Sequence, residues 1–277
     1  MTVQMRRLVP LSVLVLTLAA CGGGTEGLAI VANTQQTLTP GPNRILLAIA
    51  SEDDGSLISQ PDVATVARFF YDGEEVAAVD TEWIWAIPNV RGFLVAHVEF
   101  TAPGRWEVVL ESEGGSPTPP TLFGVQSAGL VPNIGDRAIP VETRTYPEFE
   151  LSQISSAPHP DPSLHEMSLD AALANGRPTV IAFATPAFCQ TAACGPTLEV
   201  VTDVKGEYPN VNFLHIEIYS DVESAAQGSL NPVPAVVEWA LPSEPWVFVV
   251  DANGIITARF EGATGADELR RALEGLG

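Results

Sequence analysis

The sequence predicts two domains of different class, an all-β sandwich followed by an α/β domain. Short apolar strands separated by turn residues run through 40–126, whereas helical segments and apolar strands alternate through 164–277. Prolines recur through 127–163 and predict an extended linker between the two domains that lies over one of them. The length of 277 residues fits two domains of about 100–150 residues each.

Four segments support the sandwich. Each is apolar or alternates apolar and polar residues, and none carries a helical period: 44–50, 63–71, 93–100 and 106–111. Asp72-Gly73 is a turn dipeptide that ends the second segment. The turn Pro103-Gly-Arg-Trp106 resembles a turn of the small immunoglobulin-like sandwiches attached to bacterial envelope proteins. That resemblance implies an immunoglobulin-like fold for 40–126.

The second half has the element order of an α/β sheet that ends in a hairpin. Ser168 predicts the start of a helix that Gly176 ends. The following strand, 178–185, is almost free of polar residues, as expected of a central strand covered on both faces. The remaining predicted elements are a helix at 196–207, a strand at 211–219, a short helix at 235–240, strands at 246–251 and 255–260, and a helix at 265–276.

The N-terminus has the pattern of a secretory signal. Arg6 and Arg7 precede the apolar run 8–18, which is too short to span a bilayer. Leu-Ala-Ala-Cys21 then resembles the end of a bacterial lipoprotein signal. The resemblance implies a signal peptide at 1–20, acylation of Cys21, a flexible tether at 21–39, and a lipid anchor on the extracytoplasmic face of the cell membrane. An ordinary signal peptide with a fortuitous cysteine remains the alternative.

Charge and cysteine content narrow the function. The chain carries 34 acidic against 13 basic residues, a formal charge of −21. Such a surface repels phosphate, which excludes nucleic-acid binding and electrostatic attraction to anionic lipid headgroups. There are three cysteines. With Cys21 acylated, Cys189 and Cys194 remain as a pair in a compartment that permits disulfides.

This pair carries the chemistry that the sequence predicts. Cys189-Gln-Thr-Ala-Ala-Cys194 joins the strand 178–185 to the next helix. A helix N-terminus offers free amides and positive partial charge, which stabilise a thiolate. In this position the segment resembles the redoxin-type active site of the thioredoxin-like superfamily. The segment 131–140 likewise resembles the stretch that leads into a redoxin domain. The resemblance implies thiol–disulfide exchange with protein thiols or disulfides of the cell envelope, in which Cys189 attacks and Cys194 resolves.

A second segment supports the same resemblance. Glu244-Pro245-Trp246 directly precedes an apolar strand and resembles the cis-proline segment that faces the cysteines in thioredoxins. A cis peptide bond before Pro245 is therefore predicted, with Pro245 helping to present the partner's backbone.

The spacing differs from the two-residue spacer of thioredoxins. Residues five apart on a helix rise about 7.5 Å, beyond the roughly 7 Å that a disulfide allows between Cα atoms. Pro196 suits the first position of a helix, which favours placing Cys189 in the loop ahead of it.

Three other interpretations stay open. The four-residue spacer also resembles one peroxiredoxin group, but Pro186 stands where that family has a hydroxyl residue and Arg259 is the nearest arginine. Cys194-Gly-Pro-Thr197 resembles a thioredoxin motif with Cys194 as nucleophile. Alternatively, the cysteines form a permanent disulfide in a non-catalytic redoxin-fold scaffold.

No cofactor or metal site is predicted. His159 and His165 flank a proline-rich segment without converging carboxylates, and His215 lies inside a predicted strand. The sequence has neither a phosphate-binding glycine loop nor a nucleophile elbow.

Overall fold

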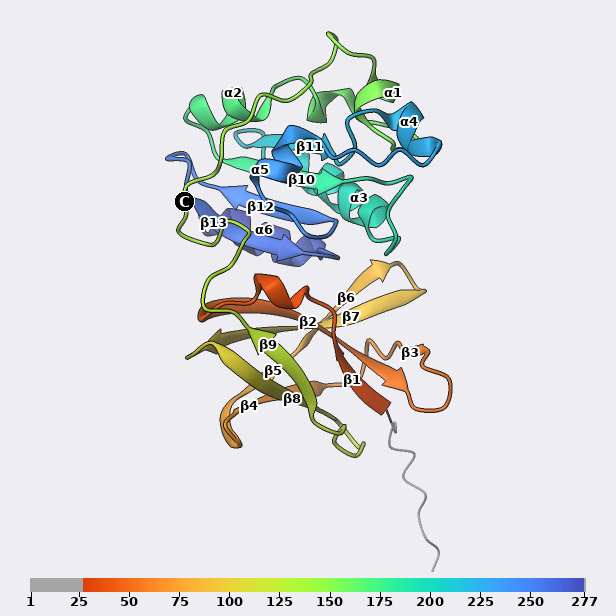
Figure 1. Cartoon of the computed structure of the whole chain (residues 1–277), viewed down its shortest axis with the longest axis vertical. Helices are drawn as coiled ribbons and strands as arrows, with labels where there is room; N and C mark the ends of the chain where they lie inside the picture. Colours follow the sequence, from red (N-terminus) through yellow and green to blue (C-terminus); the bar gives the residue numbers. More distant parts are fainter. Residues whose placement is uncertain (1–26, 277) are drawn as a thin grey trace, which may run out of the picture.

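The structure is a computed structural model that describes residues 27–276. It contains a β-sandwich and an α/β domain that lie one above the other in Figure 1. The predicted signal peptide, 1–20, and the predicted acylation site, Cys21, lie outside the described residues. Within the part of the chain that is described, no helix is both long and apolar enough to cross a bilayer.

The sandwich consists of two antiparallel sheets. One has the order β1-β2-β7-β6, with β3 paired to β2, and the other has the order β5-β4-β8-β9. Their bounds are β1 Gly27–Val31, β2 Gly41–Ser51, β3 Leu57–Ile58, β4 Thr65–Tyr71, β5 Glu74–Asp80, β6 Glu82–Ile87, β7 Arg91–Phe100, β8 Gly104–Ser112 and β9 Thr121–Val125. Four aromatic side chains fill the space between the sheets: Phe69, Phe100, Trp106 and Phe123.

The predicted tether at 21–39 is wrong for its described part. Strand β1 pairs with β2 from Gly27 onward, and a 3-10 helix follows at Gln35–Thr37. Ala29 and Leu38 are buried in the sandwich core. The short segment Gly27–Val31 alternates buried and exposed residues, and it forms an edge strand because the backbone of β2 is available for pairing on that side.

The segment 127–163, predicted as a linker, covers the α/β domain. Val131, Ala138 and Val141 are buried in the core of that domain. The segment also forms the short helix α1 (Leu151–Ile154) and leads into a 3-10 helix at Pro162–Leu164. It therefore forms one wall of the α/β domain as well as connecting the two domains.

The α/β domain is built on a four-stranded sheet in the order β11-β10-β12-β13. The pair β10–β11 is parallel, and β10–β12 and β12–β13 are antiparallel. Its elements are α2 Leu169–Ala174, β10 Thr179–Ala184, α3 Cys194–Lys205, β11 Asn212–Glu217, α4 Val222–Ala226, α5 Pro234–Glu238, β12 Trp246–Val250, β13 Ile256–Glu261 and α6 Ala266–Glu274. This topology agrees with the predicted α/β sheet that ends in a hairpin.

Helices cover both faces of this sheet (Figure 1). Helices α3 and α6 bury Val201 and Leu269 against one face. Helices α2 and α5 bury Leu169 and Ala235 against the other face. All residues of β10 and β12 are consequently buried, which accounts for the near absence of polar residues in these strands.

The structure differs from the predicted helices in two places. Helix α3 begins at Cys194, two residues before the predicted start, so that Pro196 lies at the third helical position. Helix α4 was not predicted; Asp221 caps it by accepting a hydrogen bond from the Ser224 amide at 2.7 Å.

The two domains are joined by buried polar contacts. The Arg44 guanidinium of β2 donates to both oxygens of the Glu268 carboxylate of α6, at 2.6 and 2.9 Å. Glu261 of β13 accepts from the Thr34 amide at 2.8 Å and from the Thr37 hydroxyl at 2.6 Å. Buried ions require such complete pairing, so this interface fixes one domain against the other.

An apolar cluster beside these contacts reaches the cysteine loop. We call this cluster the hairpin cluster. Phe93 packs against it, and its buried side chains come from both domains: Leu46, Ile84, Ala86, Val95, Ala193 and Ala263. Gly265 has no Cβ, and one added there would lie 2.9 Å from Ile84 Cγ2. The hairpin of β6 and β7 thus packs beside the start of α3, at Ala193, and beside the start of α6, at Gly265.

Candidate functional site

Cys189 and Cys194 lie in the connection between the end of β10 and the first residue of α3. Cys189 is half-buried in the loop, whereas Cys194 is the first residue of α3 and is fully buried. Both are free thiols in this structure. The structure thus brings the two predicted cysteines together, with Cys189 ahead of the helix as the spacing argument favoured.

The loop directs polar hydrogens at the Cys189 sulfur. The Cys194 backbone N–H donates to Cys189 Sγ at 3.3 Å, and Thr191 Oγ1 lies 3.2 Å from the same sulfur. Ala192 adopts a φ of 57°, in the left-handed region that L-residues rarely occupy. This turn folds the spacer back, so that Cys189 sits over the first turn of α3.

These contacts separate the acidities of the two thiols. The pKa of Cys189 is lowered to about 5, chiefly because the Cys194 thiol donates to its sulfur; burial opposes this shift and Thr191 adds to it. The pKa of Cys194 is raised, because its proton is held by Cys189 and because it is buried. At neutral pH Cys189 is therefore a thiolate and Cys194 a thiol, which makes Cys189 the more reactive of the two sulfurs.

The segment before β12 reaches the site through Glu244, whose carboxyl interacts electrostatically with both cysteines. The peptide bond between Glu244 and Pro245 is cis, as predicted, and the Pro245 carbonyl accepts a hydrogen bond from the Gly262 amide at 2.8 Å. Burial raises the pKa of the Glu244 carboxyl, and the charge of Cys189 raises it further. A carboxylate therefore shares the local field of the two sulfurs.

Thr191 and Glu244 were not predicted as site residues. Thr191 stood in the spacer, where only a folded loop shows that its hydroxyl faces Cys189. Glu244 was considered only as the residue before Pro245. An acidic residue beside a predicted cis-proline segment was the one available signal for its role.

The geometry does not favour two of the other interpretations. Arg259, the nearest candidate for a peroxide-binding arginine, donates instead to the Thr37 and Pro132 carbonyls at the domain boundary, at 2.8 and 3.3 Å. Cys194 is 0% exposed with a raised pKa, whereas a nucleophile needs access and a thiolate. Cys189 is the better candidate for the attacking sulfur on both counts.

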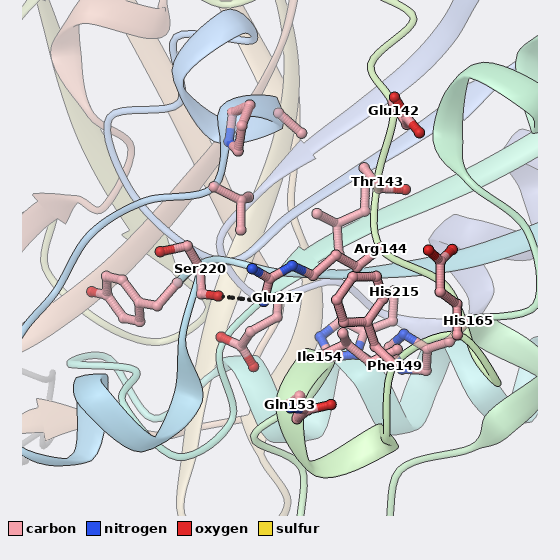
Figure 2. Close-up of a pocket in the computed structure, with 16 residues that line it drawn as sticks. Glu142, Thr143, Arg144, Phe149, Gln153, Ile154, His165, His215, Glu217 and Ser220 are labelled. Carbon is pink, nitrogen blue, oxygen red and sulfur yellow. Dashed lines mark hydrogen bonds between the residues drawn. The ribbon is translucent and has the colours of Figure 1, made fainter.

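A separate cavity of about 370 Å³ lies at the β11 edge of the sheet, between this strand and the segment that precedes α2. Figure 2 shows Arg144, His165, His215 and Glu217 around it. The His215 ring is fully buried and pairs through Nε2 with the Ala184 carbonyl at 3.0 Å, and its Nδ1 lies 3.4 Å from His165 Nε2. Burial lowers the pKa of both histidines. They are neutral structural residues here, as the sequence indicated for His215.

Metal ligation has no candidate in 27–276. No group of three or more His, Cys, Asp or Glu side chains is arranged to hold an ion in this range. His159 is exposed in the segment before α2.

Among known proteins, only solved structures are similar to this chain. No family model matches the chain, and no curated protein matches it. A thiol:disulfide interchange protein of the thioredoxin family from Chlorobium tepidum TLS is 16% identical, with a TM-score of 0.35, over 53% of this chain and 99% of that one. MTB DsbF, in mixed oxidized and reduced forms, is 20% identical, with a TM-score of 0.33, over 45% of this chain and 96% of that one.

The sandwich also has a structural likeness. The filamin domain of Lin-41 is 15% identical, with a TM-score of 0.23, over 36% of this chain and 93% of that one. With TM-scores below 0.5, these likenesses do not establish a family for the chain.

Proposed function

We propose that this protein is a thiol–disulfide oxidoreductase whose C-x4-C pair exchanges disulfides with partner proteins of the cell envelope. One observation carries the proposal: the half-buried Cys189 sulfur accepts the amide of Cys194 at 3.3 Å, while the Cys194 thiol lies fully buried behind it. A structural disulfide needs no such division between an accessible, acidic thiol and a buried one.

The exchange needs only the two sulfurs and the partner. The Cys189 thiolate attacks one sulfur of a partner disulfide, and the other partner sulfur leaves as a thiolate that takes a proton from water. Cys194 then loses its proton and attacks Cys189 Sγ in the mixed disulfide. The second partner thiol leaves, and a Cys189–Cys194 disulfide remains. The partner gains two electrons in one direction and loses them in the other.

The amide of Cys194 supports both steps. Cys189 is the attacking thiolate in the first forward step, and it is the leaving group in the last reverse step, when the partner's second thiol attacks the partner sulfur of the mixed disulfide. A hydrogen bond to an ionised sulfur is stronger than one to a neutral thiol, so the amide lowers the energy of the thiolate in each case. Pro245, which follows Glu244 through a cis peptide bond, is proposed to contact the partner's backbone.

Two assays run side by side test this function. Reduced protein, with dithiothreitol as electron source, should accelerate insulin reduction, and Cys189→Ser should abolish the acceleration. The same samples should consume hydrogen peroxide no faster than a simple thiol. Rapid peroxide consumption with no insulin reduction would favour the peroxiredoxin-like alternative, and neither activity would favour a redoxin-fold scaffold.

We also propose that Cys21 is acylated and anchors the protein to the extracytoplasmic face of the cell membrane. The support is the sequence pattern before Cys21. In the expressing bacterium, Cys21→Ser should move the protein from the membrane fraction to the soluble fraction. Retention of the variant in the membrane fraction would contradict the anchor.

A further inference from the structure

Thr191 lies in the spacer between the two cysteines, and its side chain turns toward Cys189. Its Oγ1 atom is 3.2 Å from Cys189 Sγ and accepts the Ala193 amide at 3.4 Å. A hydroxyl has one proton and two lone pairs. Because a lone pair is occupied by the Ala193 amide, the hydroxyl proton is free to point at the sulfur.

We propose that Thr191 is a hydrogen-bond donor to the Cys189 thiolate, and that the sandwich domain holds Thr191 in place through Arg91. This inference rests on the proposed function and names the residues that tune that site. It gives the sandwich a part in the chemistry of the α/β domain, beyond that of an attached module.

The sandwich contacts the spacer at two points. Arg91, the first residue of β7, donates from Nη1 to the Thr191 carbonyl at 3.4 Å. Ala193 is 4% exposed and packs in the hairpin cluster beside Ile84. Between these two anchors, Ala192 takes its left-handed conformation. The position of the Thr191 backbone is thus set from the other domain.

The effect on the site follows from the charge of the sulfur. The Thr191 hydroxyl acts together with the Cys194 thiol and amide, which already lower the pKa of Cys189. In the resolving step the bond between Cys189 and the partner is replaced by the Cys189–Cys194 bond. In the reverse direction Cys189 departs as a thiolate, and its departure is faster when a donor faces it.

Paired substitutions test the hydroxyl. Alkylation of Cys189 by iodoacetamide is followed by mass spectrometry from pH 3 to pH 9, and its midpoint gives the pKa. Thr191→Val, which keeps the shape and removes the donor, should raise this midpoint by about half to one pH unit. Thr191→Ser should restore it. Gln190→Ala, an exposed neighbour in the same loop, is the control and should leave it unchanged.

A second pair tests the sandwich. Arg91→Met, which removes the donor, should raise the midpoint in the same direction but less than Thr191→Val, and Arg91→Lys, which keeps a donor, should restore part of the effect. Circular dichroism confirms that each variant is folded. A wild-type midpoint in Thr191→Val would overturn the role of the hydroxyl. A wild-type midpoint in Arg91→Met would overturn the role of the sandwich.

These outcomes are distinguishable from failure of the proposed function. If the wild-type protein reduces no insulin but Thr191→Val still shifts the midpoint, the exchange function is wrong and the thiolate contact stands. If the wild-type protein reduces insulin but Thr191→Val does not shift the midpoint, the exchange function stands and the proposed contact of Thr191 with the thiolate is wrong.

Discussion

The backbone amide of Cys194 donates to the sulfur of Cys189 at 3.3 Å. A four-residue spacer achieves this contact because Cys194 is the first residue of α3 and its amide has no partner within the helix. The spacer folds back through Ala192, which brings Cys189 over the free end of the helix. The longer spacing thus places one sulfur where helix polarity favours a thiolate.

The acidity of Cys189 depends on the thiol of Cys194 as well as on its amide. Cys194→Ala keeps the amide and removes the thiol, which is the largest cause of the lowered pKa of Cys189. We expect the pKa of Cys189 to rise above its value of about 5, and Cys194→Ser, which retains a donor, to shift it less. Because the thiolate is the reactive form, alkylation of the wild type should slow as the pH falls through about 5. An unchanged midpoint in both variants would assign the effect to the Cys194 amide and to Thr191.

Glu244 should report the redox state of the pair. Burial raises the pKa of its carboxyl, and the Cys189 thiolate adds to the increase. Formation of the disulfide removes that negative charge, so the pKa of Glu244 should fall on oxidation. Reduction therefore draws a proton onto Glu244 at pH values between its two pKa values. Carbon-13 NMR titration of labelled glutamate carboxyls measures the change, with reduced Cys189→Ser as a control that lacks the charge. A higher pKa in the oxidised protein would contradict the placement of Glu244.

The ion pair between Arg44 and Glu268 should be essential for the domain interface. Their side chains are 6% and 2% exposed. Burial alone raises the pKa of Glu268, but Arg44 outweighs it and holds that pKa below its ordinary value. Arg44→Met leaves a buried carboxylate unpaired and should cost about 3 to 5 kcal/mol in urea unfolding. The double variant Arg44→Met/Glu268→Leu should recover part of the loss.

The exposed pair of Arg271 and Glu82, which also bridges the domains, provides the matched control. Arg271→Gln should change stability far less, because solvent screens an exposed pair. Equal costs for Arg44→Met and Arg271→Gln would show that the buried pair does not hold the interface. Since the pKa of Glu268 is lowered on folding, its stabilising effect is present above the unfolded pKa and is lost as the pH falls through the folded pKa.

The conformation of Ala192 should be mildly unfavourable. Its φ of 57° is disfavoured for a residue with a Cβ, and glycine adopts it without that penalty. Ala192→Gly should therefore stabilise the folded protein by up to about 1 kcal/mol in thermal or urea unfolding. Ala187→Gly, in the same loop without a positive φ, should be neutral or destabilising. A loss of stability in Ala192→Gly would show that chain flexibility outweighs the relief.

Much of the architecture was accessible from the sequence. The apolar strand β10, the two successive strands 246–251 and 255–260, and the cysteines at a strand-to-helix junction are local patterns, and they predicted the α/β sheet and the place of the site. The peptide bond before Pro245 is cis as predicted. These features depend on neighbouring residues in the chain, so a local pattern contains enough information.

The features that were missed depend on residues far apart in the chain. Strand β1, for example, exists because β2 pairs with it. The contact of Arg91 with Thr191 spans 100 positions, and no local pattern marks either residue as a partner. The early start of α3 has a similar cause, since Ala193 is packed against the sandwich.

Trapping of the mixed disulfide tests the assigned roles of the cysteines most directly. Reduced Cys194→Ser protein is incubated with a disulfide-bonded substrate such as insulin, quenched in acid and mapped by mass spectrometry without reduction. We expect a covalent adduct through Cys189 that persists in Cys194→Ser, is resolved in the wild type, and does not form in Cys189→Ser. An adduct through Cys194 in Cys189→Ser at the same rate, or none in any variant, would contradict the account.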